Sequence, residues 1–289
     1  MTAGLAATDP STGAMTTACT QNGPIAFVTD DGPTAVSNIA LVSPRGRGLL
    51  QLTLTGDAWS PSWSPDGTRL VYEDHVDGDG DIYVMDRDGT NVENLTEGSA
   101  ADEASPEWSP NGRWIAFASD RANARRSSFD IYKMRADGSS VTRLTSNRVQ
   151  DWTPTWAPDS RRIAFVRIAN IDQLMVMRAD GSRVRNITGD DDGTNPDWSP
   201  NGRRIAYQSL DGFGGEMDIY TIRPDGSRKK RVTSGGSNEQ SPSWSPNGRR
   251  IAFTRSWQLY KMRPGGSDET HIPTGQGDVY VPSWGPRLC

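Results

Sequence analysis

The sequence predicts an all-β chain folded as a six-bladed β-propeller, and three observations support this. A Pro-x-Trp tripeptide recurs six times, with its Trp residues 45, 48, 42, 46 and 40 positions apart. Short apolar runs bounded by Pro, Gly and Asp follow each copy, as is typical of strands. The first and last units are incomplete in complementary ways. Repeats of this length are typical of propellers and solenoids. The six copies are Pro61–Trp63, Pro106–Trp108, Pro154–Trp156, Pro196–Trp198, Pro242–Trp244 and Pro282–Trp284.

Each unit reads as a four-stranded antiparallel meander, whose strands we name a to d in chain order. Strand a carries Pro-x-Trp, and a Ser-Pro-Asp-Gly turn follows it, as at Ser64–Gly67. Strand b contains an apolar triplet such as Ile115–Phe117, and strand c begins with Asp-Ile-Tyr, as at Asp81–Tyr83. An Asp-Gly turn then leads to strand d, which we expect at pairs such as Leu95-Thr96. Gly and Asn suit these turns because they tolerate positive φ.

The two ends of the chain together supply one blade. The N-terminal unit starts with strand b at Ile25–Phe27, and the C-terminus ends with strand a at Pro282–Trp284. We predict that the C-terminal strand 281–285 pairs with the N-terminal blade, because ring closure removes the exposed sheet edges of an open array. We expect residues 1–23 to be disordered or loosely attached, and residues 24–289 to form a single propeller domain, a length that all-β domains reach.

The repeat resembles the WD40-like PD40 repeat of the TolB family of β-propellers, over roughly residues 24–286. The matching motifs are Trp-Ser-Pro-Asp-Gly at Trp63–Gly67 and Asp-Ile-Tyr at Asp81–Tyr83. The family is named for a periplasmic Tol-Pal component, so the resemblance implies a periplasmic or secreted protein. About twenty residues rich in Ser, Thr, Ala and Gly precede Ile25, too few for the α/β domain of TolB itself. We therefore expect an isolated propeller.

The two cysteines flank the predicted seam of the ring. Cys19 precedes the first strand and Cys289 follows the last one, so a disulfide between them would lock the closure and fit an oxidising compartment. The alternative is two unrelated terminal thiols. The sequence has no run of eighteen apolar residues, so we expect no membrane insertion. Residues 1–20 show neither a basic start nor an apolar stretch, so no intact signal peptide is visible.

The two faces of the predicted disc differ in their connections. The a–b and c–d turns share one face and are short and nearly uniform, whereas the b–c and d–a loops share the other and vary in length. Irregular loops on a rigid scaffold usually carry recognition, so we predict that the b–c/d–a loop face is the working surface. Acidic residues gather on that face and arginines on the other, which favours a basic partner or a cation. The alternative is ordinary solvated charge.

Six residues at the start of strand a are candidate partner contacts. Four places before the repeat Trp stand Trp59, Trp152 and Tyr280, which we expect at the mouth of the central channel. Aromatic side chains there could hold a partner's side chain or a sugar ring, or could pack on neighbouring loops. One place earlier stand acids that could contact a partner or bond to adjacent backbone N–H groups. These acids are Glu103, Asp151 and Glu239.

Metal binding and catalysis find little support. Asp77, Asp79 and Asp81 have the spacing of the first three EF-hand ligands, but Ile82 stands where Gly is needed, so they are weak candidates for Ca²⁺. Only two histidines are present, in different units, and Gly-x-Ser-x-Gly is absent. We expect no other cofactor. Nucleic-acid binding is not expected, because the arginines recur at repeat positions with few aromatics among them and the pI is about 5.2.

These observations favour a monomeric, non-catalytic propeller that binds a protein or peptide on its b–c/d–a loop face. The alternative is a carbohydrate-binding or polysaccharide-active propeller of the lyase or hydrolase kind.

Overall fold

A computed structural model gives the fold of the chain and describes residues 22–30, 36–54, 56–76, 78–122, 128–210, 215–234 and 236–288. Within these ranges the chain forms strands, turns and bends, and it contains no helix that could cross a membrane. Cys19, Cys289 and Asp77 lie outside the described residues, so the predicted disulfide stays a prediction.

The described strands form six sheets, each of four antiparallel strands. Blade 1 consists of β24 (Asp278–Pro286), β1 (Asn22–Asp30), β2 (Ser37–Val42) and β3 (Leu50–Gln51). Blade 2 consists of β4 (Ala58–Trp63), β5 (Arg69–Asp74), β6 (Asp81–Asp86) and β7 (Glu93–Asn94). Blade 3 consists of β8 (Glu103–Trp108), β9 (Trp114–Ser119), β10 (Asp130–Arg135) and β11 (Thr142–Arg143). Blade 4 consists of β12 (Gln150–Trp156), β13 (Arg162–Ile168), β14 (Asp172–Arg178) and β15 (Arg185–Asn186). Blade 5 consists of β16 (Thr194–Trp198), β17 (Ile205–Leu210), β18 (Met217–Ile222) and β19 (Lys230–Arg231). Blade 6 consists of β20 (Glu239–Trp244), β21 (Ile251–Arg255), β22 (Gln258–Met262) and β23 (Thr270–His271).

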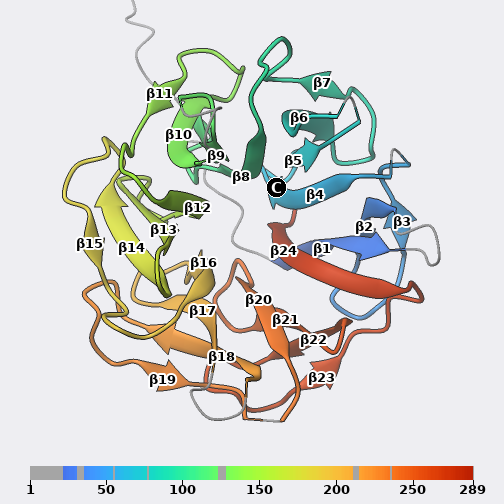
Figure 1. Cartoon of the computed structure of the whole chain (residues 1–289). Coiled ribbons are helices and arrows are strands. Elements are labelled where there is room, and N and C mark those ends of the chain that lie inside the picture. Colours follow the sequence, from blue (N-terminus) through green and yellow to red (C-terminus); the bar gives the residue numbers. More distant parts are fainter. Residues whose placement is uncertain are drawn as a thin grey trace, which may run out of the picture.

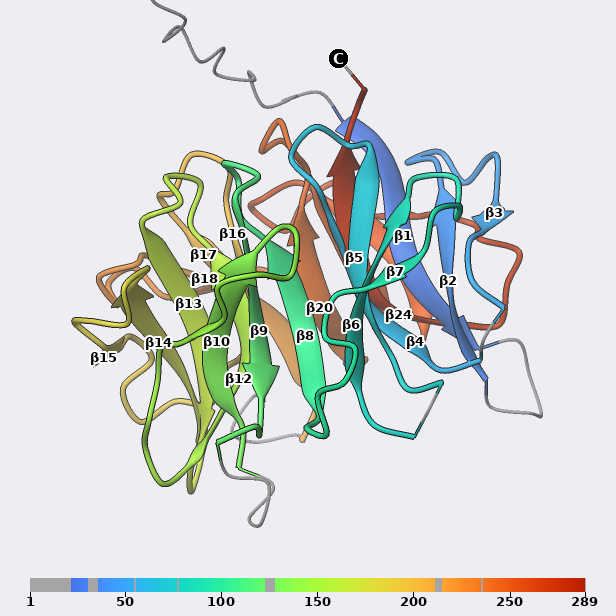
Figure 2. The same ribbon diagram turned by 90° about the horizontal axis from the view of Figure 1, so that it is seen from above.

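The sheets stand around one axis as a closed six-bladed propeller, which confirms the predicted fold class (Figure 1). The predicted closure is also confirmed, because β24 pairs antiparallel with β1 and Ile25 lies opposite Trp284. In Figure 1 the red β24 lies beside the blue β1. Figure 2 shows the disc from the side, with the C-terminal end of β24 on the face opposite the b–c loops.

The prediction for strand d was wrong by about two residues. In blade 2 the strand is Glu93–Asn94, which ends just before Leu95-Thr96, and the other blades follow the same rule. The Thr turns inward instead: its hydroxyl accepts the N–H of Ile82 at 3.0 Å and donates to the carboxylate of Asp81. The Leu95 N–H still donates to the Ile82 carbonyl at 2.8 Å. The Leu-Thr pair therefore closes the outer edge of the blade with one further backbone bond and with the Thr side chain.

The hydrophobic core is divided among the six spaces between adjacent blades. Six clusters of buried side chains fill these spaces, and a repeat Trp lies in each. Side chains alternate along a strand, so strand b serves two spaces at once. In β5, Leu70 and Tyr72 pack toward blade 1, whereas Val71 packs toward blade 3. Each sheet is thus buried on both faces.

A β-bulge interrupts every strand a at the same place. The third residue before the repeat Trp has a positive φ, and the register of the a–b pair shifts there. The next residue is always Pro, which has no N–H to lose from the ladder and is tolerated at bulges. This explains why Pro recurs at a fixed distance before Trp. The six positive-φ residues are Ser60, Ser105, Thr153, Asn195, Ser241 and Val281.

Gly285 gives a direct test of packing at the ring seam. A Cβ on Gly285 would lie 2.5 Å from an indole carbon of Trp63 in blade 2. We expect Gly285→Ala to lower the free energy of unfolding by about 1–3 kcal/mol, because the rigid indole and β24 must move apart. Urea unfolding measures the change. Gly265→Ala is the matched control, since no atom lies within 4 Å of that Cβ; equal stabilities of the two variants would contradict tight packing at the seam.

Candidate binding face and central channel

The structure gives the two faces different connections. The a–b turns occupy five or six positions, such as 64–68 and 245–250, and the c–d turns occupy six or seven, such as 87–92 and 263–269. The b–c loops range from two positions at 256–257 to ten at 120–129. Every blade makes the same a–b and c–d turns, so the lengths of these turns are nearly constant. The b–c loops differ in length from blade to blade, which suits a binding surface.

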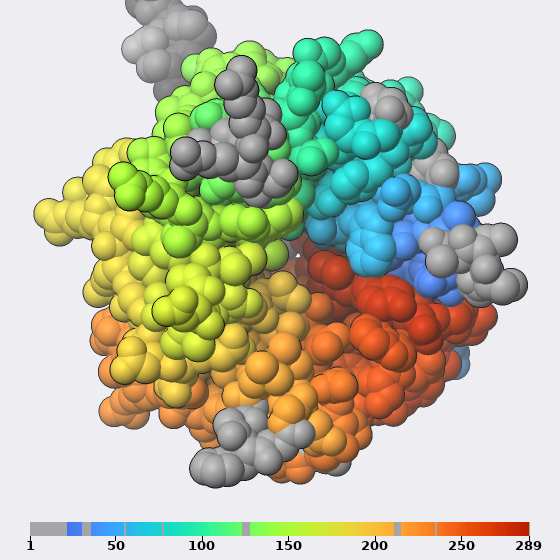
Figure 3. Space-filling model, in the orientation of Figure 1, coloured from blue at the N-terminus to red at the C-terminus, as the bar shows by residue number. Residues whose placement is uncertain are grey.

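The bulges of the a strands build the wall of a central channel. Figure 3 views the loop face and shows a narrow hollow at its axis. The cavity has a volume of about 130 Å³ and is lined by the three residues before the repeat Trp in five blades, and by Thr153 and Pro154 in blade 4. The aromatic residues predicted to ring its mouth stand one place earlier and do not line it. The residue directly before Trp is Ser62, Glu107, Thr155, Asp197, Ser243 or Ser283 in successive blades.

Glu107 and Asp197 are the two acidic members of the channel wall, and the sequence analysis missed both. Burial raises the pKa of Glu107 to about 8, the charge of Asp197 adds to this effect, and hydrogen bonds from the Thr155 hydroxyl and the Trp156 N–H oppose it. Burial raises the pKa of Asp197 to about 7, against the N–H groups of Trp244 and Trp198. The signal that could have found them is an acid at a position where the other blades have Ser or Thr.

No cationic side chain lines the channel among the described residues. The two carboxyl groups are therefore the ionisable groups among its lining residues, and they could accept protons or bind a cation. The described part of the chain holds no group of three or more His, Cys, Asp or Glu side chains arranged to bind a metal ion.

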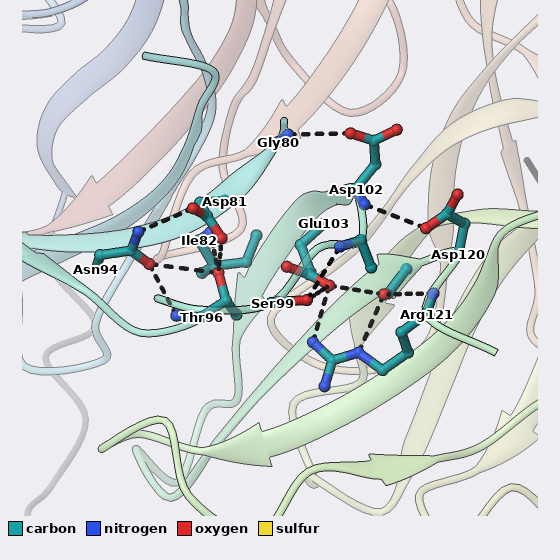
Figure 4. A network of polar contacts seen from close by, with 12 residues as sticks. Gly80, Asp81, Ile82, Asn94, Thr96, Ser99, Asp102, Glu103, Asp120 and Arg121 are labelled. Atoms are coloured by element: carbon teal, nitrogen blue, oxygen red, sulfur yellow. Dashed lines mark hydrogen bonds and ion pairs between the residues drawn. The ribbon is translucent and has the colours of Figure 1, made fainter. Parts of the chain in front are cut away.

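The predicted acidic contacts are buried and paired, so they do not reach the surface. Glu103, Asp151 and Glu239 are all 0% exposed. Glu103 Oε1 accepts bonds from Ser99 and Ser119 and pairs with Arg121 at 2.9 Å (Figure 4). Asp151 pairs with Arg167 at 2.8 Å, and Glu239 pairs with Arg255 at 2.7 Å. This is a correction to their assignment as partner contacts: each acid holds an Arg on or beside strand b. Burial raises the pKa of Glu103 and of Glu239, and the paired Arg opposes the shift.

The weak calcium candidates are not assembled into a site by the described residues. Asp81 is buried and bonded to Thr96 and to the Asn94 amide, the latter at 2.9 Å (Figure 4). The same acid in blade 3, Asp130, pairs with Arg143 at 2.6 Å. Asp81 therefore performs the structural role of the repeat.

The three predicted aromatic residues fall into two places. Trp59 and Tyr280 lie together, with ring centroids 5.8 Å apart, across the seam between blades 2 and 1. Trp152 instead packs on Phe129 of blade 3, with centroids 4.0 Å apart, and donates from its indole to Gln150. Sequence reasoning missed Trp257, whose ring centroid lies 5.0 Å from that of Tyr280. The signal in the sequence that could have identified Trp257 is its position in the very short segment between strands b and c of blade 6.

Acidic side chains on the loop face are exposed in several sectors. Asp191 pairs with Lys229 at 2.8 Å, so the predicted separation of charge between the faces is incomplete. His75 bonds to Glu73 at 2.9 Å, and this bond raises the pKa of His75. Exposed acids of the loop face outside these pairs include Asp57, Asp102, Asp190 and Asp278.

Comparison with known proteins places this architecture in a family. The family model described as PD40, TolB beta propeller domain, matches residues 24–211 and 122–288. The chain belongs to this family of TolB-like β-propellers.

Curated relatives share parts of the chain. An uncharacterized protein of Agrobacterium fabrum, Atu1656, is 33% identical over 145 residues, which are 50% of this chain and 48% of that protein. A protein TolB homolog of Chlorobium luteolum is 34% identical over 209 residues, covering 66% of this chain and 45% of the homolog. A Tol-Pal system protein TolB of Desulfosudis oleivorans is 28% identical over 129 residues, covering 42% and 26%. The matches span about half or less of these relatives.

A solved structure shares the fold. TolB from Acinetobacter baumannii superposes with a TM-score of 0.76 and 22% identity, covering 92% of this chain and 67% of that one. At this level of identity the likeness concerns the fold alone.

The channel acids predict a pH dependence of stability. Between about pH 4 and pH 8, Glu107 and Asp197 hold protons in the folded protein that they have released in the unfolded chain. These two groups therefore make the free energy of unfolding fall as pH rises. We expect Glu107→Gln with Asp197→Asn to flatten this fall and to raise stability at pH 8 by about 1–3 kcal/mol. Denaturant unfolding across this range measures the effect. Asp190→Asn, on the exposed loop face, is the control, and an unchanged pH profile in the double variant would refute the assignment.

The buried ion pairs predict a large effect of removing one partner. Arg167→Met leaves the buried Asp151 carboxylate without its cation, and we expect a loss of about 2–4 kcal/mol in the free energy of unfolding. Adding Asp151→Asn removes the charge and should recover part of the loss. Chemical denaturation of both variants checks this; a loss of less than about 0.5 kcal/mol for Arg167→Met would show that the pair is weak.

Proposed function

We propose that this chain is a non-catalytic propeller that binds a protein or peptide on its b–c/d–a loop face. The family supports a scaffold role, and one relative is named a Tol-Pal system protein. By analogy we propose that the chain works in the periplasm with protein partners of a Tol-Pal-like system. The single-domain arrangement and the monomeric state remain part of the proposal.

The observation that carries the proposal is the contrast between the faces. Turns of five to seven positions repeat on one face, whereas the other face carries b–c loops of two to ten positions beside d–a loops of six to eight. A fold held rigid by six buried interfaces can vary these loops without losing its core. Exposed acids such as Asp57, Asp102 and Asp278 give the loop face a surface suited to a basic partner.

The chemistry of the described side chains supports binding rather than catalysis. His75 is engaged by Glu73 at 2.9 Å, and His271 lies on β23, the outermost strand of blade 6. The two histidines therefore stand in different blades. Glu107 and Asp197 face a cavity of about 130 Å³, too small for a polymeric substrate but open to small ions.

Two exposed aliphatic residues of blade 4 allow a matched test of the face. Ile171 lies in the b–c loop and Val184 in the c–d turn, and both are 38% exposed. We expect a photo-crosslinking amino acid at position 171 to capture a discrete protein in a periplasmic extract, and the same group at position 184 to capture none. Mass spectrometry of the crosslinked bands identifies the partner. Equal capture from both positions would contradict the assigned face, and binding to a glycan array with no protein capture would favour the carbohydrate alternative.

A further inference from the structure

We infer that Trp59, Tyr280 and Trp257 form a subsite that binds a basic side chain, Arg or Lys, of the protein partner. We call these three residues the seam cluster. The inference rests on the proposed function and names the residues and the chemistry by which the loop face would select its partner.

The seam cluster draws one aromatic ring from each of three consecutive blades. Trp59 opens β4 of blade 2, Tyr280 lies on β24 of blade 1, and Trp257 lies at the tip of the β21–β22 hairpin of blade 6. Tyr280 is the centre, with ring centroids 5.8 Å from Trp59 and 5.0 Å from Trp257. The planes are inclined by 58° and 46°. The rings therefore form corners rather than one flat platform.

Backbone and side-chain bonds hold the cluster in place. The N–H of Val279 donates to the carbonyl of Trp257 at 2.8 Å, which ties the hairpin tip to β24. The Ser256 N–H donates to Asn238 at 3.3 Å, and the Trp59 indole donates to Asp57 at 3.1 Å. A surface that is ordered before binding loses little conformational entropy on binding.

Trp257 occupies a turn position that suits Gly far better. The hairpin loop is Ser256-Trp257, with φ of 46° and 61°, where two-residue turns favour Asn-Gly. A bulky residue at positive φ is strained. Trp257 is nevertheless 42% exposed, so burial offsets only part of that cost. Neither the turn nor the core explains a Trp here, whereas a surface contact does.

Carboxylates surround the seam cluster and select the charge of its ligand. Asp57 and Asp278 are exposed, and no ion pair joins either of them to a Lys or Arg within the described ranges. Asp30 stands opposite Asp278 across the β1–β24 ladder, where like charges repel. Burial, followed by the charges of Asp278 and Asp30, raises the pKa of Tyr280.

Aromatic faces and carboxylates together bind a guanidinium or ammonium group, the rings through cation–π contact and the acids through charge-assisted hydrogen bonds. A sugar would call for a flatter ring surface and for donors as well as acceptors. The inclined rings and the excess of carboxylates therefore favour a basic side chain.

The test uses the full chain and tetra-arginine amide, with tetra-citrulline amide as the uncharged isostere, in calorimetric titrations at low ionic strength. We expect binding of the arginine peptide, and binding of the citrulline peptide to be weaker by about tenfold or more. Trp257→Gly should weaken arginine binding by a similar factor while the melting temperature stays the same or rises, because Gly adopts this φ without strain. Asp57→Asn with Asp278→Asn should also weaken it, whereas Asp190→Asn should not.

Three outcomes would overturn the subsite: equal binding of the two peptides, unchanged binding by Trp257→Gly, or a marked fall in the melting temperature of that variant, which would make Trp257 structural. The crosslinking at position 171 separates the two proposals. Capture of a partner that persists in Trp257→Gly leaves the binding face intact and removes the subsite. Absence of capture from position 171 in the chain that keeps Trp257 refutes the binding face, while the titrations still decide whether the seam cluster binds a cation.

Discussion

The pairing of β24 with β1 is the contact on which the rest of the molecule depends. It completes blade 1, and blade 1 lines two of the six hydrophobic spaces, one shared with blade 2 and one with blade 6. Trp284 and Phe27 pack together in the second of these, although they come from opposite ends of the chain. Without this pairing β1 would be an exposed sheet edge. The faces of blades 2 and 6 that pack against blade 1 would also be exposed. Closure thus turns six separately marginal sheets into one cooperative body.

The bulge in strand a links this architecture to the channel. Positive φ at non-Gly residues costs about 1–3 kcal/mol each, and Thr153 and Val281 are β-branched. Neighbouring blades help to hold the bulges: the Ser105 N–H donates to Glu73 and the Ser241 N–H donates to Gln208, both at 2.8 Å. In return each bulge brings two or three consecutive residues to the wall of the channel. The bulges that bond to neighbouring blades therefore also determine which side chains line the channel.

The buried and the exposed acids of the loop face have different roles. The acids at the start of strand a neutralise arginines and fix the ends of the strands, so they belong to the framework. The exposed acids stand on the d–a loops and around the seam cluster, where nothing in the repeat requires them. This division separates residues that maintain the shape of the rim from residues that give the rim its specificity, and it locates the proposed binding chemistry at the junction of blades 6, 1 and 2.

The sequence by itself determined the number of blades, the closure of the ring and the buried Trp and apolar triplets. The number of blades and the closure follow from the spacing of the repeats and from the complementary first and last units, and the buried residues follow from the alternation of apolar side chains along each strand. Only the tertiary structure decided that strand d stops before Leu95-Thr96, that Glu103 is buried against Arg121, and that Trp257 joins Tyr280. It also brought Glu107 and Asp197 to the same cavity. The first two outcomes depend on side chains that meet within one blade across a loop or a strand, and the others on side chains that meet across the axis or the seam; in both cases the residues are apart in the sequence, and their spacing does not show that they meet.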